Sequence, residues 1–396
     1  MSDPWLTVVG LGEDGLGGLG DASRAAIAAA EVIFGGARHL ALVGAGARGR
    51  EWPVPFDLAP VLKMRGRRVV VLASGDPFWF GAGSLIAGRL APGEWRALPV
   101  AGVVSLACAR MGWRVEEVHA VALHAAPFAR LRPVLSRGAR VIATLRDGAA
   151  VLDLAHWLQE KGFGAVSMTV LERLGGPAER IRTACLEEIE MMDVSAPVAM
   201  ALDGATLPAG AGLSAVPGRA EAEFAHDGQI TKAPVRAMTL AALAPRAGEL
   251  LWDIGGGSGS VSVEWCLAGG RAIALEPRTD RIANIEANIE AFGLTARMRV
   301  MQRRAPEALA GLELPAAVFV GGGTSEALFV ALWDRLAPGT RIVANAVTLE
   351  SEALFVALQA RHGGTLMRIE IAQAAPLGGM RGWVPSRPVV QWSVVR

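Results

Sequence analysis

A strand that runs into a glycine-rich loop and then into a helix is the feature that most constrains this fold. Residues 250–260 read LLWDIGGGSGS, and the expected helix N-terminus carries partial positive charge while glycines let a ligand approach the backbone. A dinucleotide fingerprint would place its third glycine at position 260, but that residue is Ser260 and the glycine is Gly259. The spacing favours a methyltransferase loop over a dehydrogenase loop. A tight turn without a ligand is the alternative.

The strand–helix alternation continues to the C-terminus. Glu276 closes the next expected strand, roughly twenty residues after the loop begins, where a carboxylate can hold both hydroxyls of a ribose. A solvated acid at a strand end is the alternative. Strands are expected over residues 250–254, 271–275, 317–320, 341–345, 367–372 and 389–395, and helices over 235–243, 280–292, 325–336 and 351–361. This order predicts a doubly wound, Rossmann-like sheet that ends in antiparallel strands.

The first half shows a separate α/β pattern. It begins with a short strand, a glycine loop over 10–15 and a helix from Ser23, and further strands are expected near residues 69–73, 141–144 and 166–171. All periodicity is lost between Asp203 and Arg219, where Gly, Pro and Ala predominate. Because 396 residues exceed one ordinary core, we expect two domains, 1–204 and 222–396, joined by a linker over 205–221.

Charge and cysteine usage exclude several classes of protein. The formal net charge is +1, without a Lys/Arg block, so a general nucleic-acid binder is not expected. The three cysteines lie far apart without a paired spacing or a neighbouring histidine, so no metal site and no disulfide frame is expected. No apolar stretch reaches about 18 residues, which predicts a soluble cytoplasmic protein that does not bind membranes.

Six segments of the second half together resemble the decarboxylating precorrin methyltransferase family, over about residues 222–396. They are QITKAPVR (229–236), the glycine loop, Glu276, RAPEAL (304–309), VGGG (320–323) and NAVTLE (345–350). The resemblance implies a class I methyltransferase fold that binds S-adenosylmethionine. The binding residues that it implies are Thr231, Asp253, Gly255, Gly256, Gly257, Ser258, Gly259, Glu276, Ala305 and Gly321.

Three segments of the first half resemble the tetrapyrrole methylase family, class III, and in particular its precorrin-6Y branch. They are ASGDPFWFG (73–81), PVAGVVS (99–105) and VLERLGGPAERI (170–181). The resemblance implies a two-lobed fold that encloses S-adenosylmethionine, with Gly10 and Gly12 facing a tetrapyrrole. Val104 stands where the family has Ser or Thr, so its contribution is expected from the backbone alone. The cofactor residues implied are Ser74, Asp76, Trp79, Val104, Ser105 and Pro197.

The order of the two halves makes the whole chain similar to the precorrin-6Y C5,15-methyltransferase family. That family adds methyl groups at carbons 5 and 15 of precorrin-6Y and removes the ring C acetate carboxyl group, giving precorrin-8 on the route to cobalamin. The resemblance implies one S-adenosylmethionine per domain. It suggests carbon 5 for the first domain and carbon 15 with decarboxylation for the second. We also expect a homo-oligomer.

Decarboxylation and the binding of substrate carboxylates suggest further candidate residues. Decarboxylation requires a proton at the resulting methylene carbon, which Lys232 or Glu350 could assist. Asn345, at a strand end, either faces the substrate or caps a turn. Arg236 and Arg381 are candidates for binding substrate carboxylates, because a guanidinium group binds a carboxylate through two parallel hydrogen bonds. Solvated surface charge is the alternative for both arginines.

Two other functions are alternatives for a chain of this kind. An RNA- or protein-modifying methyltransferase shares these fold classes, but it predicts a basic face that the composition does not show. A non-catalytic tetrapyrrole carrier predicts decayed cofactor loops, whereas the glycines and Glu276 are intact.

Overall fold

The computed structural model describes residues 4–396 and divides into two compact units. The first unit comprises the residues up to Phe128 together with Val134–Gly212, and the second comprises Ala129–Pro133 together with Leu213–Arg396. The main division, between Gly212 and Leu213, falls inside residues 203–219, where the sequence shows no periodicity.

The first unit begins with a parallel five-stranded sheet, in the order β3-β2-β4-β1-β5. The central strand β1 is buried along its whole length, as expected of a parallel strand covered on both faces. The strands end at one edge, which brings the loops after β1, β2 and β4 together. The elements of this lobe are β1 (Leu6–Leu11), α1 (Asp21–Ala29), β2 (Val32–Gly35), α2 (Ala37–Leu42), β3 (Gly49–Glu51), α3 (Ala59–Leu62), β4 (Val69–Ser74), α4 (Ala82–Ala87) and β5 (Trp95–Leu98).

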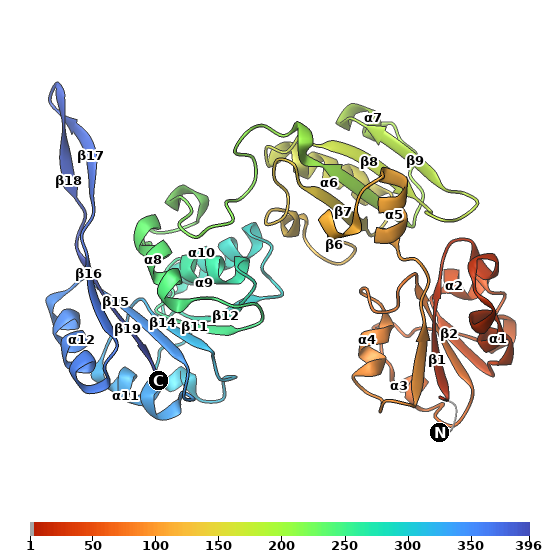
Figure 1. Ribbon diagram of the computed structural model, residues 1–396, viewed down its shortest axis with the longest axis horizontal. Helices are drawn as coiled ribbons and strands as arrows, with labels where there is room; N and C mark the ends of the chain where they lie inside the picture. The colour runs from red at the N-terminus through yellow and green to blue at the C-terminus, as the bar shows by residue number, and fades with distance from the viewer. Residues whose placement is uncertain (1–3) are drawn as a thin grey trace. The chain divides into compact units, whose positions relative to one another are not determined.

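A second five-stranded sheet, in the order β6-β7-β10-β8-β9, completes the first unit (Figure 1). Only β6 and β7 run parallel, and the other neighbours are antiparallel. The expected strands near 141–144 and 166–171 are confirmed as β7 and β8. The elements are α5 (Val103–Met111), β6 (Val118–Ala122), β7 (Arg140–Leu145), α6 (Ala149–Glu160), β8 (Ser167–Glu172), β9 (Arg180–Ala184), α7 (Leu186–Glu190) and β10 (Val198–Asp203).

The second unit is built on a seven-stranded sheet in the order β13-β12-β11-β14-β15-β19-β16. Strands from β13 to β15 are parallel, whereas β19 runs antiparallel to both its neighbours, so the predicted doubly wound sheet with an antiparallel end is confirmed. The elements are α8 (Ala233–Leu243), β11 (Leu250–Ile254), α9 (Ser260–Leu267), β12 (Arg271–Leu275), α10 (Thr279–Ala291), β13 (Met298–Met301), β14 (Ala317–Val320), α11 (Glu326–Arg335), β15 (Arg341–Ala346), α12 (Leu349–His362), β16 (Thr365–Ile369) and β19 (Val389–Val395).

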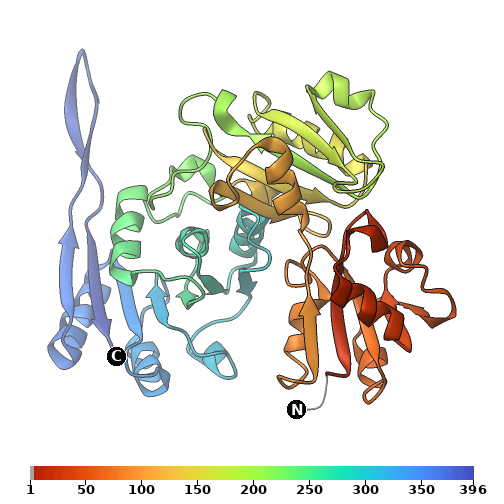
Figure 2. The same ribbon diagram turned by 45° about the vertical axis from the view of Figure 1, so that its right-hand side comes forward.

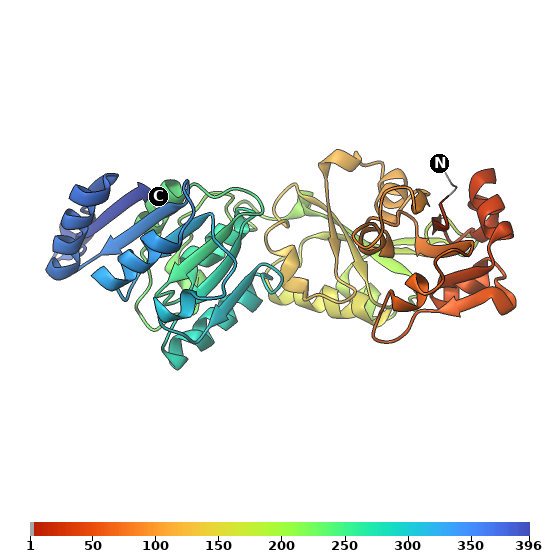
Figure 3. The same ribbon diagram turned by 90° about the horizontal axis from the view of Figure 1, so that it is seen from below.

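Helices cover both faces of this sheet (Figure 3). Trp252 of β11 packs with Phe329 of α11 and Phe355 of α12 on one face. On the other face, Leu251 packs with Leu240 of α8 and Ile285 of α10. Alternate residues of β11 therefore pack into two separate hydrophobic cores. This packing fixes the register of the sheet and the position of the loop that follows β11.

A hairpin that the sequence analysis missed joins β16 to β19. Its strands β17 (Ala372–Leu377) and β18 (Met380–Pro385) form a separate two-stranded sheet, which projects from the seven-stranded sheet in Figures 1 and 2. Its apolar side chains are exposed, with Met380 at 80% and Trp383 at 76% of their maximal accessible area. Within residues 4–396, no helix is both long and apolar enough to cross a bilayer.

Candidate functional site

The glycine loop of the second unit adopts a backbone that only glycine accepts readily. Gly255, Gly257 and Gly259 have φ values of +71°, +59° and +71°, in the left-handed region that costs other residues energy. A Cβ added to Gly255 would lie 2.7 Å from the backbone nitrogen of Gly322. This close approach holds the loop against the segment after β14, so both loops border one site at the carboxyl edge of the sheet.

Glu276 fixes the other side of this loop. It directly follows β12, is 2% exposed, and its Oε2 accepts a hydrogen bond of 2.9 Å from the Gly257 backbone N–H. Oε1 accepts a bond of 3.0 Å from the Arg278 N–H. Because an ionised carboxylate offers about four acceptor positions, both oxygens retain capacity for the hydroxyl groups of a ligand.

Asp253 lies one residue before the end of β11 and is fully buried. Its Oδ2 accepts a bond of 2.6 Å from Ser262 Oγ, whereas Oδ1 has no hydrogen-bond partner among residues 4–396. Burial and, to a smaller extent, the negative charge of Glu276 raise the pKa of Asp253 to about 6, although the hydrogen bond from Ser262 opposes the shift. A buried acceptor without a partner marks this edge as a place where a bound group completes the hydrogen bonding.

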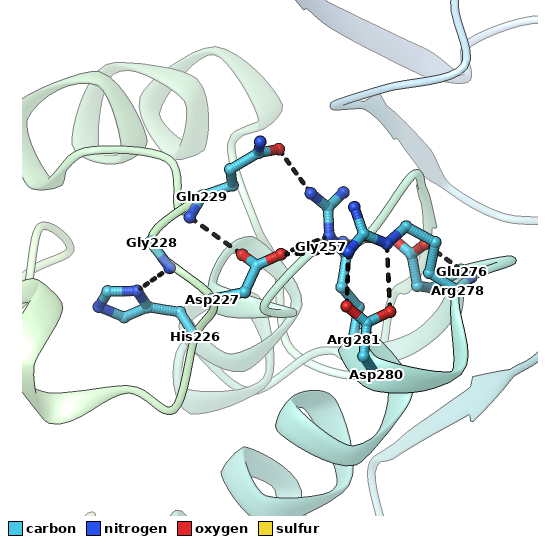
Figure 4. A network of polar contacts seen from close by, with 9 residues as sticks. All are labelled: His226, Asp227, Gly228, Gln229, Gly257, Glu276, Arg278, Asp280 and Arg281. Carbon is cyan, nitrogen blue, oxygen red and sulfur yellow. Dashed lines mark hydrogen bonds and ion pairs between the residues drawn. The ribbon is translucent and has the colours of Figure 1, made fainter.

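A strap of residues 226–229, which precedes α8, faces Arg278 and Arg281 at the start of α10 in Figure 4. Asp227 holds it in place by accepting hydrogen bonds of 3.0 Å from the Gln229 N–H and from Arg281 Nε of α10. These two bonds lower the pKa of Asp227. A Cβ added to Gly257 would lie 3.9 Å from the carbonyl oxygen of Gln229. The strap therefore forms a second wall of the site and leads directly into Thr231.

The first unit contains a cavity of about 720 Å³ at the carboxyl ends of β1 and β4. The N-terminus of α5 also borders it. The predicted residues that line it are Gly12, Ser74, Asp76, Trp79, Val104, Ser105 and Pro197.

Charged residues that the sequence analysis missed lie at the same cavity. Glu13 and Arg38 line it and form an ion pair. Arg38 also donates a 3.2 Å hydrogen bond to Ser74 Oγ. Burial and the charge of Arg38 lower the pKa of neighbouring His39 to about 4. The position of Arg38 just after a parallel strand was the sequence signal that could have identified it.

Each half of the chain matches a known family. Residues 6–190 match the tetrapyrrole (corrin/porphyrin) methylases, and residues 222–396 match a precorrin methyltransferase domain. A decarboxylating precorrin-6Y C(5,15)-methyltransferase from Sinorhizobium sp is 47% identical over 402 residues, which cover 98% of this chain and 96% of that relative. The chain belongs to the precorrin-6Y C(5,15)-methyltransferase family. Both resemblances and the two-domain α/β fold class are confirmed.

Other members of the precorrin-6Y methyltransferase family match as well. A decarboxylating precorrin-6Y C(5,15)-methyltransferase of Mycobacterium tuberculosis H37Rv is 40% identical over 405 residues, 99% of this chain and 100% of that relative. The crystal structure of the C-terminal domain of precorrin-6Y C5,15-methyltransferase from Rhodobacter capsulatus is 72% identical. It covers 46% of this chain and 100% of that chain, with a TM-score of 0.46.

Two residues predicted to bind substrate are buried in this family member and do not line the expected surfaces. Arg236 was expected at a pocket rim but is 0% exposed, and its Nε donates a 2.9 Å bond to the equally buried Glu264. Its other nitrogens donate to the carbonyl oxygens of Thr231 and Arg219. Gly10 was expected to face the tetrapyrrole but is buried in β1, where an added Cβ would lie 1.9 Å from the Gly75 oxygen. Both positions serve packing because a second chain segment lies directly against them.

The predicted catalytic residues lie on separate elements. Lys232 is the exposed N-cap of α8, and Glu350 is exposed in the first turn of α12. Asn345 Nδ2 donates a 2.9 Å bond to Thr239, and its Oδ1 accepts a 3.0 Å bond from Gln391. Asn345 therefore lies inside β15 and not in a turn, and its side chain is hydrogen-bonded to two neighbouring side chains. Its catalytic role and those of Lys232 and Glu350 remain predictions.

Of the other predicted residues, Arg381 is exposed on β18 and Ser258 is 3% exposed. Gly321 donates its N–H to the Ile254 oxygen at 2.9 Å, and Ala305 packs against the core. Within residues 4–396, no group of three or more His, Cys, Asp or Glu side chains could hold a metal ion.

Proposed function

We propose that this chain methylates precorrin-6Y at carbons 5 and 15 and removes the ring C acetate carboxyl group as carbon dioxide, giving precorrin-8 in cobalamin biosynthesis. The observation that carries the proposal is the 47% identity to a decarboxylating precorrin-6Y C(5,15)-methyltransferase across 98% of the chain. The structure adds a ligand-sized cavity in the first unit and a glycine loop with two buried carboxylates in the second.

The glycine-loop site of the second unit suits S-adenosylmethionine, which supplies a methyl group on a positively charged sulfur. Glu276 would hold the ribose hydroxyls, because its oxygens retain acceptor capacity beside Gly257. Asp253 Oδ1 would accept a further hydrogen bond. Gly255, Gly256 and the rest of the loop would approach the ligand through their backbones. Thr231, Ser258, Ala305 and Gly321 complete the proposed set.

The cavity of the first unit would hold a second S-adenosylmethionine. Its volume of about 720 Å³ lies within the range of small-molecule sites. Asp76 Oδ1 accepts a 2.8 Å bond from the Phe78 N–H, which fixes this carboxylate at the cavity wall. Val104 still offers its backbone groups, since these are independent of the side chain. We assign carbon 5 to this unit, and carbon 15 with decarboxylation to the other.

Methyl transfer asks mainly for positioning from the protein. A nucleophilic meso carbon attacks the methyl group in line, and the electron pair of the breaking carbon–sulfur bond stays on sulfur as the neutral thioether leaves. The positive charge passes to the macrocycle, which releases it as a proton. Water exclusion and alignment should therefore dominate the rate enhancement. Apolar and backbone groups, which form much of the cavity wall, are adequate for this task.

Decarboxylation needs one further proton. When the bond to the carboxyl group breaks, its electron pair enters the macrocycle and a proton is delivered to the methylene carbon. We propose that Lys232, an exposed N-cap beside Thr231, or Glu350 in the first turn of α12 assists this step.

The proposed function, and the division of its reactions between the two units, are tested by incubating the protein with precorrin-6Y and isotope-labelled S-adenosylmethionine and measuring the mass of the product. Wild type is expected to add two methyl groups and lose carbon dioxide. The variant Gly257→Val places a side chain in the space beside the glycine loop of the second unit. It is expected to lose decarboxylation and methylation at carbon 15. A wild-type protein that leaves precorrin-6Y unchanged would contradict the proposal.

We also infer a homo-oligomer. The hairpin β17–β18 exposes the cross-strand pair Leu377 and Met380 on one face and Trp383 on the other, and exposed large apolar side chains are common at protein contacts. Light scattering of the full chain measures its mass directly, and a monomer at micromolar concentration would contradict the inference.

A further inference from the structure

Arg38 lies at the wall of the open cavity of the first unit. It follows β2 in the first turn of α2, and its side chain is 40% exposed. Glu13, from the loop after β1, pairs with one end of the guanidinium group, and Ser74 at the end of β4 accepts from the other. Three strand ends thus hold one guanidinium group in a fixed orientation, while part of it remains accessible.

Arg173 adds a second positive charge to this place. It follows β8, its backbone N–H donates a 2.9 Å bond to the oxygen of the cavity-lining Pro197, and its Nε donates a 3.1 Å bond to the Ala196 oxygen. Burial and the nearby charge of Arg173 together lower the pKa of Arg38. The loop that carries Arg173 lies directly on the loop after β1, because a Cβ added to Gly176 would lie 2.5 Å from Glu13 Cβ.

Charged groups of both signs lie around this part of the cavity. The guanidinium groups of Arg38 and Arg173 are positive, and the carboxylates of Glu13 and Asp76 are negative. His39 contacts Ser74 at 2.9 Å, but its lowered pKa of about 4 keeps it neutral at pH 7. The other acid at the cavity wall, Asp76, is held by its own loop, since its Oδ1 accepts a bond from the Phe78 N–H. The accessible part of the Arg38 guanidinium group beside Ser74 can therefore donate to an anionic group of a ligand.

We propose that Arg38, supported by the charge of Arg173 and oriented by Glu13, binds a peripheral carboxylate of the tetrapyrrole in the cavity of the first unit. This assignment rests on the proposed function, which supplies a substrate with carboxylate side chains. A guanidinium group binds a carboxylate through two parallel hydrogen bonds, so it fixes orientation as well as position. Because Arg38 contacts Ser74, a predicted cofactor residue, a carboxylate held there would place the macrocycle next to the methyl donor.

Titration of the full-length protein with precorrin-6Y in the presence of S-adenosylhomocysteine, which prevents turnover, tests this assignment. Wild type is expected to show one tetrapyrrole site in each unit. In Arg38→Gln the affinity of one site should fall roughly 10- to 100-fold, the loss expected for a charge-assisted hydrogen bond. Arg173→Gln should weaken the same site by a smaller factor. The affinity for S-adenosylhomocysteine should stay within about twofold, which excludes misfolding.

Arg65→Gln is the matched control, because Arg65 pairs with Glu94 and is 60% exposed away from the cavity lining. Precorrin-6Y with its carboxylates converted to amides should bind wild type and Arg38→Gln equally. Unchanged tetrapyrrole affinity in Arg38→Gln, or an equal loss in Arg65→Gln, would overturn the assignment. A wild type that binds no precorrin-6Y would instead refute the proposed function.

Discussion

Two buried carboxylates end neighbouring strands of the second unit, and their surroundings differ. Glu276 accepts backbone N–H bonds on both oxygens, whereas Asp253 has one partner, Ser262. Burial raises the pKa of Asp253 from 3.8 to about 6. Folding therefore favours the protonated form of Asp253. Its stabilising contribution is complete below about pH 3.8 and is lost as the pH rises through about 6.

Replacing Asp253 by Asn should remove this pH dependence. At pH 8 the ionised Asp253 costs about 3 kcal/mol of folding free energy, from roughly two pKa units at 1.36 kcal/mol each. Asp253→Asn should raise the melting temperature of the ligand-free second unit at pH 8, with the gain shrinking as the pH falls towards 4. Scanning calorimetry across this range measures it.

The exposed Asp334 on α11 provides the control, since Asp334→Asn should leave the profile unchanged. If Asp253→Asn is no more stable than wild type at pH 8, burial of the ionised Asp253 does not reduce the folding free energy. The same variant should bind S-adenosylmethionine more weakly, because its uncharged side chain offers a poorer acceptor.

At the scale of elements, a buried ion pair ties α8 and α9 together. Glu264 of α9 accepts from Arg236 of α8 and from the backbone N–H groups of Gly218 and Arg219, at 2.8 to 3.0 Å. Glu264 and Arg236 are both fully buried as side chains. This cluster fixes the start of α8 and thereby Thr231, whose carbonyl oxygen Arg236 also contacts.

Glu264→Gln should therefore destabilise the second unit strongly. Removing one charge leaves Arg236 buried without its counter-charge, which typically costs about 3–5 kcal/mol. The matched variant Glu313→Gln breaks an exposed pair with Arg271 and should cost no more than about 1 kcal/mol. Urea unfolding measures both changes, and equal losses in the two variants would contradict a dominant role for the buried pair.

Local sequence predicted every strand of the main sheet except β13, together with the glycine loop and its ligand class, because glycine spacing and apolar periodicity act within one segment. In the first unit it missed the strands β2, β3, β5, β6, β9 and β10. It could not predict that Arg236 is buried, since the partner Glu264 lies 28 residues away on another helix. It also failed for Gly10, where the constraint comes from Gly75. Arg38 was missed because the cavity exists only where several strand ends converge.

The hairpin β17–β18 was missed for a related reason. Its side chains are mostly exposed, so the alternation between a buried and a solvated face is absent from its sequence. The order of all seven strands in the main sheet also required the structure, because β19 inserts between β15 and β16.

At the scale of the whole molecule, the central claim is that each unit binds its own methyl donor. The two sites are built from different elements, although both lie at the carboxyl ends of parallel strands. One is a cavity bounded by strand ends and α5, and the other is a glycine loop between β11 and α9. A variant in one site should therefore leave binding at the other site intact.

Isothermal titration of the full chain with S-adenosylmethionine measures this claim most directly. Wild type should bind two molecules per chain, and Gly257→Val or Gly102→Val, which fill the loop cradle and the cavity respectively, should each bind one. Saturation of wild type at one molecule or none per chain would contradict the account.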